Sequence, residues 1–575
     1  MKQTIFRMHL LRILSALIVL VLVYNLFEIQ VVEGEHWRNV SENNRFRHLV
    51  QTAPRGKIIT ADGVELADNI PAYNVALAHE PDSDRRNETI EVLSSIIDMP
   101  VEDIVERVAG HSRRFEPVVV ARDIDFETVL LLEENRHRMP ALVIQVTPKR
   151  VYPQEMLLAH ALGRTNIDYT GTEGLELQWD EYLTGQDGLS VVQVNATARP
   201  VGAPVYSQPA VPGHNLHLTI DAGLQQAAQD SLQRVIEFNR EERGAHQAYS
   251  GSVVVMDVNT GQILAMVSEP TFDANKKHET SLWDSENRYL INRAVGYRRP
   301  IGSTFKMITG LAALEENKAT ATETIRCTGR TSILSFPTVC YNSVAHGHLS
   351  MRGALDRSCN IYFGTMGVRL GYEMIYEYAE MFGLTREVRN AGFTDLPQGE
   401  QQTSLDFRRA QDSWWGGDTV QISYGQLNEF TPLQVANYVT MLANGGIHYK
   451  PYMVEQIVDA NGETVEEFAP EVLAEYAFAP ENMLVIHEGM RAAARSTASL
   501  RGLPFDVAGK TGTAQDGRKG YDSHSWWVGF APYDEPEIAI VAFMEHGVLG
   551  SRSAEIGRDI IDYYFGLIEE ENEDE

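Results

Sequence analysis

Cysteine, positive charge and internal repetition are scarce in this chain, and each shortage excludes a class of protein. Three cysteines in 575 residues are too few for a disulfide-rich scaffold. The net charge of −30 argues against a nucleic-acid partner, which needs a basic surface. No segment recurs at the roughly 20- to 50-residue period of repeat proteins. We therefore expect two or more ordinary domains, since the chain is too long for a single core.

The start of the chain has the features of a membrane anchor. The basic residues Lys2, Arg7 and Arg12 precede an apolar run that ends at Phe27. The run is about 20 residues long, enough to span a bilayer as a helix, and the basic flank predicts a cytoplasmic N-terminus. No small-x-small cleavage site follows. We expect an uncleaved, single-pass anchor over residues 1–30, with the rest of the chain outside the cell membrane.

A proline- and glycine-rich segment at residues 209–213 separates two parts of different character. Residues 31–212 mix charged helical stretches with short strand signals and hold no cluster of catalytic groups. Two apolar runs within residues 251–267 then predict a hairpin, and a second strand pair and an amphipathic helix come near the end. Strands on both sides of a helical middle predict an α/β (α+β) domain over residues 213–568. An acidic tail, residues 569–575, follows.

Three short motifs occur in a fixed order in this second part. They are S-x-x-K at Ser303–Lys306, S-x-N at Ser358–Asn360 and K-T-G-T at Lys510–Thr513. Each motif alone is more often an ordinary cap, loop or edge strand, because so short a pattern arises by chance. The ordered set is specific, and it indicates a serine nucleophile with a lysine one helical turn away.

The first two motifs supply a nucleophile, a base and a proton relay. The spacing of Ser303 and Lys306 puts both side chains on one helix face. A serine hydroxyl needs a base to remove its proton, and Lys306 serves if burial and nearby charge lower its pKa. Gly302 allows close backbone approach at the helix start. Ser358 can relay a proton to a leaving amine, and Asn360 can hold the lysine or bind a substrate amide.

The third motif is typical of a substrate-binding strand. Lys510 and the hydroxyls of Thr511 and Thr513 suit a substrate carboxylate. Gly512 leaves the strand edge bare, so that a peptide can add as a further strand. The backbone N–H groups of Ser303 and Thr513 are the expected oxyanion hole.

With these motifs the chain resembles a class B penicillin-binding protein over nearly its whole length. Glu42–Arg45 and Gly417–Thr419 are similar to the elongation type, penicillin-binding protein 2, and the division type is the close alternative. Other matching segments are Arg55–Ile58, Arg150–Pro153, Gly174–Glu176, Leu183–Gly185, Asn292–Ala294 and Thr431–Gln434.

The resemblance implies a fold, an activity and partners. It implies a serine transpeptidase, β-lactamase-like domain behind an elongated, mixed pedestal of the dimerisation type at residues 31–212. It implies a D,D-transpeptidase that cross-links peptidoglycan stem peptides on nascent glycan strands through an acyl-enzyme and is acylated by β-lactams. The implied partners are a SEDS-type glycan polymerase and elongation-complex membrane proteins. Pro300 and Leu427 depart from the family's usual loop patterns, which bears on substrate fit rather than on reaction type.

Other enzyme and binding classes fit less well. A β-lactamase or D,D-carboxypeptidase shares the motifs, but no Glu-x-x-Leu-Asn stretch lies between Asn360 and Lys510 to activate a deacylating water. A bifunctional enzyme with a glycosyltransferase domain is rejected, because Glu42–His48 lacks that domain's second carboxylate and glycine. A non-catalytic β-lactam sensor needs a cytoplasmic output domain, and the segment before the apolar run is too short for one. A pure scaffold has no reason to carry all three motifs intact.

Two cysteines and two histidines form the remaining cluster of reactive side chains. Cys327 and Cys340 lie in the part expected outside the membrane, where disulfides persist. His346 and His348 follow them, and two cysteines with two histidines are a common structural zinc set. The sequence favours a disulfide or two free thiols over a zinc site, and no other cofactor is expected.

Overall fold

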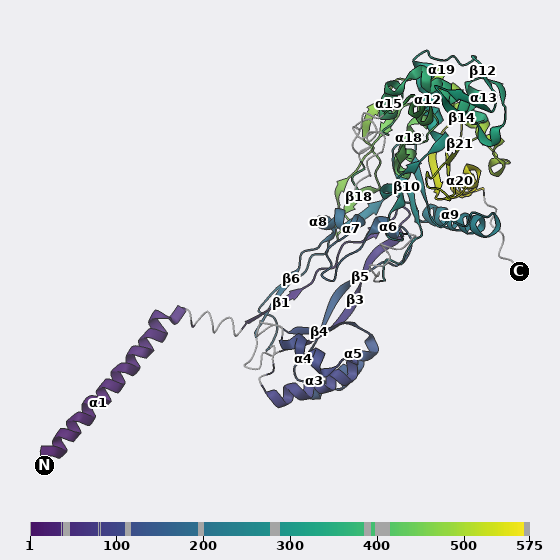
Figure 1. Cartoon of the computed structure of the whole chain (residues 1–575). Helices are drawn as coiled ribbons and strands as arrows, with labels where there is room; N and C mark the ends of the chain where they lie inside the picture. The colour runs from purple at the N-terminus through teal and green to yellow at the C-terminus, as the bar shows by residue number, and fades with distance from the viewer. Residues whose placement is uncertain are drawn as a thin grey trace. The chain divides into compact units, whose positions relative to one another are not determined.

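The chain divides into two compact units, each assembled from several segments (Figure 1). The computed structural model describes residues 2–35, 37, 46–78, 80, 82–109, 117–193, 201–276, 288–384, 393–396 and 414–567. The first unit comprises residues 1–55, 69–149 and 185–213, and the second residues 56–68, 150–184 and 214–575. The sequence motif at residues 42–45 and the acidic tail at 569–575 lie outside the described residues.

The last segment of the first unit ends at residue 213, close to the boundary that the sequence predicts. The two units nevertheless interleave along the chain. Residues 56–68 and 150–184 lie within the predicted pedestal and belong to the second unit. Hydrogen bonding explains this: β2 (Ile58–Ile59) pairs in parallel with β8 (Asn215–Leu218). In the same unit, Arg150 forms a buried ion pair with Glu176 at 2.7 Å.

The first unit carries the apolar helix and a small mixed α/β body. α1 (Lys2–Phe27) continues into a short π-helical turn, and an 18-residue window within Ile5–Val32 has a mean hydropathy of 2.4, with none of that window buried. This segment is long and apolar enough to cross a membrane. The unit's other elements are β1 (Phe46–Gln51), β3 (Glu65–Leu77), α3 (Ser83–Ile97), α4 (Val101–Ala109), β4 (Val118–Ile124), α5 (Phe126–Glu134), β5 (Leu142–Val151), β6 (Gly188–Gln193) and β7 (Tyr206–Gln208).

Apolar side chains of the first unit meet between helices and strands. β3 pairs with β4 and β5, while β1, β6 and β7 form a separate sheet. Val75 and Leu77 of β3 pack with Ile90, Leu93 and Ile104 of the helices. Asp82 caps α3 by accepting from the backbone N–H of Asp84, and Asp125 caps α5 in the same way.

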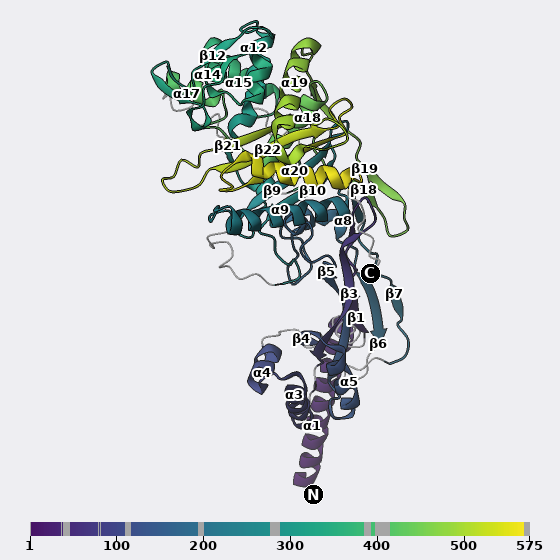
Figure 2. The same cartoon turned by 90° about the vertical axis from the view of Figure 1, so that its right-hand side faces the viewer.

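A five-stranded antiparallel sheet forms the centre of the second unit (Figure 2). Its order is β10-β9-β23-β22-β21, so the predicted sheet assembled from distant parts of the domain is confirmed. Nearly every residue of these strands is buried, because helices cover both faces. The strands are β9 (Gly251–Asp257), β10 (Ile263–Glu269), β21 (Ala508–Ala514), β22 (His524–Ala531) and β23 (Ile538–Met544).

Helices of different origin cover the two faces of this sheet. α9 (Ala222–Glu242) and α20 (Gly550–Tyr564) lie on one face, and Asp221 caps α9 as the sequence predicts. α18 (Pro432–Ala443), buried along its whole length, lies on the other face with the helical middle of the unit. That middle contains α11 (Arg293–Gly296), α12 (Lys306–Glu315), α13 (Met351–Asp356), α14 (Asn360–Leu370), α15 (Tyr372–Met381), α17 (Gly416–Ile422) and α19 (Pro480–Ser496).

Short strand pairs complete the second unit and frame its helical middle. β18 pairs with β8 and β19, in the same sheet as β2. β18 and β19 are Val454–Val458 and Thr464–Glu467. The remaining pairs are β11 (Arg299–Pro300) with β16 (Glu429–Phe430), β12 (Ile325–Cys327) with β15 (Gly347–Leu349), β13 (Arg330–Ile333) with β14 (Phe336–Val339), and β17 (Ile447–Tyr449) with β20 (Val472–Glu475).

Candidate active site

A serine and a lysine meet on one short turn in the second unit. η3 (Gly302–Phe305) is a 3-10 turn that runs directly into α12. Residues three apart are eclipsed in such a turn, and Lys306 Nζ lies 2.9 Å from Ser303 Oγ. The structure thus brings the first motif's serine and lysine into hydrogen-bonding contact.

The S-x-N motif reaches the same lysine from the start of α14. Lys306 Nζ donates to Ser358 O at 2.8 Å, to Ser358 Oγ at 3.1 Å and to Asn360 Oδ1 at 2.8 Å. Asn360 Nδ2 donates to Val339 O at 2.8 Å, which turns the amide oxygen toward the lysine. Ser358 has φ of 50°, a left-handed conformation uncommon for a residue other than glycine. Such backbone strain is often found at functional sites.

The electrostatic surroundings of Lys306 favour its neutral form. Its side chain is fully buried. Burial lowers the pKa of Lys306 well below the ordinary lysine value, and the charge of Lys510 lowers it further, against a smaller opposing effect of Cys359 and Cys340. An amine in this setting is more easily neutral than an exposed lysine, and a neutral amine can accept the proton of Ser303.

Two glycines bring the nucleophile turn against the edge strand β21. Gly302 has φ of 56°, and a Cβ at this residue would lie 2.6 Å from Thr513 O. A Cβ at Gly512 would lie 2.5 Å from Ile301 O. Side chains at either residue would therefore push the turn and the strand apart. The sequence predicts that Gly512 leaves the strand edge bare for a peptide. The structure adds a second role, which is the close packing of the turn against the strand.

The other residues of the third motif divide between the two faces of β21. Lys510 is buried, and its Nζ donates to Thr511 O at 2.9 Å. Burial lowers the pKa of Lys510 to about 7, against an opposing effect of Asp356. Thr511 and Thr513 alternate to the other face, where both are half-buried and Thr513 Oγ1 accepts from Gly550 N at 3.1 Å.

Sequence reasoning missed Gln426, which bridges two segments of the site. Its Nε2 donates to Thr513 O at 3.3 Å, and its Oε1 accepts from Gln515 N at 3.3 Å. Gln426 therefore ties the loop before α18 to the C-terminal end of β21. The Gly-Gln-Leu segment that contains Gln426 could have indicated this role, but the sequence predicted from it only an altered loop shape.

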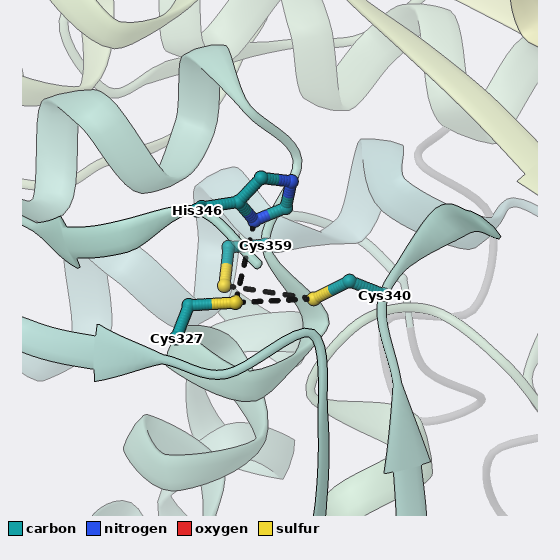
Figure 3. A group of neighbouring side chains, drawn as sticks. All are labelled: Cys327, Cys340, His346 and Cys359. Atoms are coloured by element: carbon teal, nitrogen blue, oxygen red, sulfur yellow. Dashed lines mark hydrogen bonds between the residues drawn. The ribbon is translucent and has the colours of Figure 1, made fainter. Parts of the chain in front are cut away.

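A group of three cysteines and one histidine lies beside the S-x-N motif (Figure 3). Cys340 Sγ is 3.7 Å from both Cys327 Sγ and Cys359 Sγ, and His346 Nδ1 is 3.4 Å from Cys327 Sγ. Tetrahedral zinc with Zn–S of about 2.3 Å and Zn–N of about 2.0 Å needs ligand atoms about 3.5–3.8 Å apart. The donor set and its spacing therefore fit zinc.

The group differs from the zinc set that the sequence offered as its less favoured alternative. His348 is exposed on β15 and lies outside the group, whereas Cys359 completes it. The pairing of β12 with β15 places Gly347 opposite Cys327 and leaves His346, next along the chain, within reach of its sulfur. Of the two favoured alternatives, a disulfide or two free thiols, the structure has Cys327 and Cys340 as free cysteines, and Cys359 is free as well.

Comparisons with known families cover both units. The model of the penicillin-binding protein transpeptidase domain matches residues 251–562. The model of the penicillin-binding protein dimerisation domain matches residues 50–218.

Full-length relatives and solved structures agree with these matches. The peptidoglycan D,D-transpeptidase MrdA of Acinetobacter baumannii is 28% identical, over 93% of this chain and 84% of its own length. The probable peptidoglycan D,D-transpeptidase PenA of Neisseria meningitidis is 27% identical, over 91% of this chain and 86% of its own. A chain of a peptidoglycan synthase complex that coordinates polymerization and crosslinking superposes with a TM-score of 0.72 at 26% identity, covering 98% and 99% of the two chains. Helicobacter pylori penicillin-binding protein 2 in complex with MreC shares the fold, with a TM-score of 0.75 at 22% identity over 92% of this chain and all of its own.

Proposed function

The chain belongs to the penicillin-binding protein transpeptidase family, and we propose that it is a peptidoglycan D,D-transpeptidase with Ser303 as its nucleophile. The observation that carries this proposal is the buried amine of Lys306, held within hydrogen-bonding distance of Ser303 Oγ, Ser358 Oγ and Asn360 Oδ1. This arrangement provides a base with a lowered pKa directly beside a serine hydroxyl.

Acylation follows from these contacts. Neutral Lys306 takes the proton from Ser303 Oγ, which attacks the carbonyl carbon of the terminal D-Ala–D-Ala bond of a stem peptide. Backbone N–H groups of Ser303 and Thr513 stabilise the oxyanion. The proton then passes from Lys306 through the Ser358 hydroxyl to the leaving D-Ala amine, and an ester on Ser303 remains. Lys510 binds the substrate carboxylate in its charged form.

Transfer reverses these proton movements. The amine of a second stem peptide attacks the ester and loses a proton through Ser358 to Lys306. Ser303 Oγ leaves with that proton, and the new amide is the cross-link. A β-lactam follows only the first half of the cycle, so it leaves a lasting adduct.

Mass spectrometry of a β-lactam adduct tests the nucleophile. The full-length protein in detergent, incubated with benzylpenicillin, should carry one adduct on the peptide that contains Ser303. Ser303→Ala should abolish it, while Ser551→Ala, an exposed serine of α20, should leave it unchanged. An adduct elsewhere would refute the assignment. Rapid turnover of the antibiotic would favour a β-lactamase or D,D-carboxypeptidase.

We further propose that the protein serves cell elongation, together with a SEDS-type glycan polymerase and elongation-complex membrane proteins. Its similarity to a chain of a polymerizing and crosslinking complex and its fold likeness to a protein solved with MreC support this role. The alternative is a division-type enzyme. A functional fluorescent fusion should lie along the side wall, and exclusive septal localisation would establish the alternative.

We also propose that Cys327, Cys340, His346 and Cys359 hold a structural zinc ion. Four protein ligands would close the coordination shell, which is typical of structural rather than catalytic zinc. Backbone N–H groups of Gly329 and Tyr362 already donate to two of the sulfurs at 3.4 Å, as outer-shell partners do. Bound zinc would link β12, the loop after β14 and the start of α14.

Metal analysis tests the zinc site independently of enzymatic activity. The purified protein should contain about one zinc ion per chain. Cys340→Ser should lose the metal and lower Tm, whereas His348→Ala should retain both. Protein without metal that also gains no thermal stability from added zinc would refute the site.

A further inference from the structure

One buried carboxylate connects three separate segments near the nucleophile. Glu545 directly follows β23, and its Oε2 accepts from Ser250 Oγ at 2.7 Å, next to β9. Its Oε1 accepts from Arg299 Nη2 at 2.9 Å and from the Tyr297 hydroxyl. A backbone bond from Glu545 N to Ser250 O, at 2.8 Å, fixes the carboxylate's own strand end.

The network around Glu545 is charged and largely shielded from water. Burial alone would raise the pKa of Glu545, but Arg299, Tyr297 and Ser250 lower it to about 2, so the carboxylate stays ionised. The guanidinium of Arg299 also stacks on the Tyr297 ring, 3.9 Å from its centroid. Charge-assisted hydrogen bonds of this kind restrict geometry more strongly than neutral ones.

The first connection leads from Glu545 to Ser303. Arg299 and Pro300 form β11, which pairs with Glu429 and Phe430 of β16. Gly302 N then donates to Gly425 O at 2.9 Å. The chain between Arg299 and Ser303 is short and held at both points, so the position of Arg299 helps to fix the backbone N–H of Ser303.

The second connection leads from Glu545 to Thr513. Met544, the residue before Glu545, lies opposite Ser525 of β22. Ser525 in turn lies opposite Thr513 of β21. The strand ladder therefore relates the position of Glu545 to Thr513 through two registered neighbours.

We propose that Glu545 is a positioning residue for the reaction, which holds the backbone N–H groups of Ser303 and Thr513 at the separation an oxyanion requires. This inference rests on the proposed function, since the two N–H groups matter only if Ser303 is acylated. Glu545 touches no reacting atom. It acts through Arg299 and Tyr297 on one side and through the strand ladder on the other.

Kinetics of acylation distinguish positioning from general stabilisation. Full-length Glu545→Gln in detergent keeps the side-chain shape but loses the charge. With a chromogenic cephalosporin, stopped-flow measurements separate the initial dissociation constant from the acylation rate constant. We expect the rate constant to fall about tenfold or more, because small displacements of reacting groups are costly, with the dissociation constant changed less than about twofold. The control Glu555→Gln alters a carboxylate of α20 that is paired with Arg243. It should change neither the rate constant nor the dissociation constant.

A second, milder variant covers the case in which Glu545→Gln folds poorly. Tyr297→Phe removes the hydroxyl's hydrogen bonds to Glu545 and from Arg299 without altering charge, and it should also lower the rate constant selectively. Combined in one chain, the two substitutions should be less than additive, since both act through one carboxylate. Folded variants with a normal rate constant, or with affinity and rate reduced in parallel with Tm, would overturn the proposal.

The outcome is separable from that of the proposed function. If Glu545 has no positioning role, the variants still form a full adduct on Ser303 at the normal rate. If Ser303 is not the nucleophile, the adduct lies elsewhere in the parent protein as well.

Discussion

At the scale of single residues, the site depends on two lysines buried close to one another. Lys306 and Lys510 are both shielded from water, and each lacks a carboxylate bonded to its amine among the described residues. Burial penalises the charged form of each, and their mutual repulsion adds to the effect on Lys306. These surroundings support the proposed division of roles, in which Lys306 is the neutral base and Lys510 is the cation.

Replacing Lys306 with arginine tests the base. Arginine keeps the positive charge but cannot lose its proton at working pH. We expect the acylation rate constant to fall by roughly 10²-fold or more, in line with the loss of a general base. Circular dichroism and Tm verify the fold, and a near-normal acylation rate in the folded variant would exclude the role.

The pH profile tests the assignment of Lys510. Because its pKa is about 7 in the free protein, the cation is present below that pH and is lost above it. Neutral Lys306 is needed too, so acylation should also decline at low pH, giving a bell-shaped second-order rate constant. Lys510→Arg stays charged, so its alkaline decline should disappear. An unchanged alkaline limb in that variant would show that another group causes it.

At the scale of elements, the nucleophile turn and β21 must touch backbone to backbone. Gly302→Ala introduces a Cβ 2.6 Å from Thr513 O and forces alanine into a left-handed backbone conformation. Gly502→Ala is a matched control, since Gly502 has φ of 83° with nothing within 4 Å of its Cβ position. Both variants should lower the free energy of unfolding by about 1–2 kcal/mol, because alanine is disfavoured in the left-handed conformation. Only Gly302→Ala should also lose acylation, and equal activities would show that the close contact is unimportant.

The start of α14 belongs both to the S-x-N motif and to the group of three cysteines and one histidine. Cys359 lies between Ser358 and Asn360, and its sulfur accepts from Tyr362 N in the first turn of the helix. If zinc holds Cys359, chelation should slow acylation as well as lower Tm, and added zinc should restore both. His348→Ala should respond to chelation as the parent protein does. Metal removal that lowers Tm without slowing acylation would separate the two sites.

At the scale of the whole molecule, the apolar segment Ile5–Val32 is long and apolar enough to anchor the chain in a membrane. We propose a cytoplasmic N-terminus, because basic residues flank the segment on that side. Protease added to intact spheroplasts should digest the chain beyond residue 35 and spare only the N-terminal segment. A cytoplasmic protein probed in parallel should stay intact until the membrane is permeabilised. Protection of the second unit would contradict this topology.

Local patterns in the sequence carried much of the fold. The hairpin of β9 and β10, the Asp221 cap of α9 and the apolar helix α1 each depend on neighbours a few residues apart. Such features follow from side-chain period and capping chemistry, which a linear sequence displays directly. The assembly of segments 56–68 and 150–184 into the second unit was not visible in this way, because it depends on pairings with distant strands.

The sequence by itself determined which residues are the candidates for the chemistry, because Ser303, Lys306, Ser358, Asn360 and Lys510 stand in motifs whose order is specific. Only the tertiary structure decided which other side chains join them. Cys359 replaces His348 in the sulfur cluster, and Gln426 and Glu545 reach the site from distant segments. The physical reason is that hydrogen bonds and metal ligation depend on distances of a few ångströms in space. Chain folding sets those distances between residues far apart in sequence.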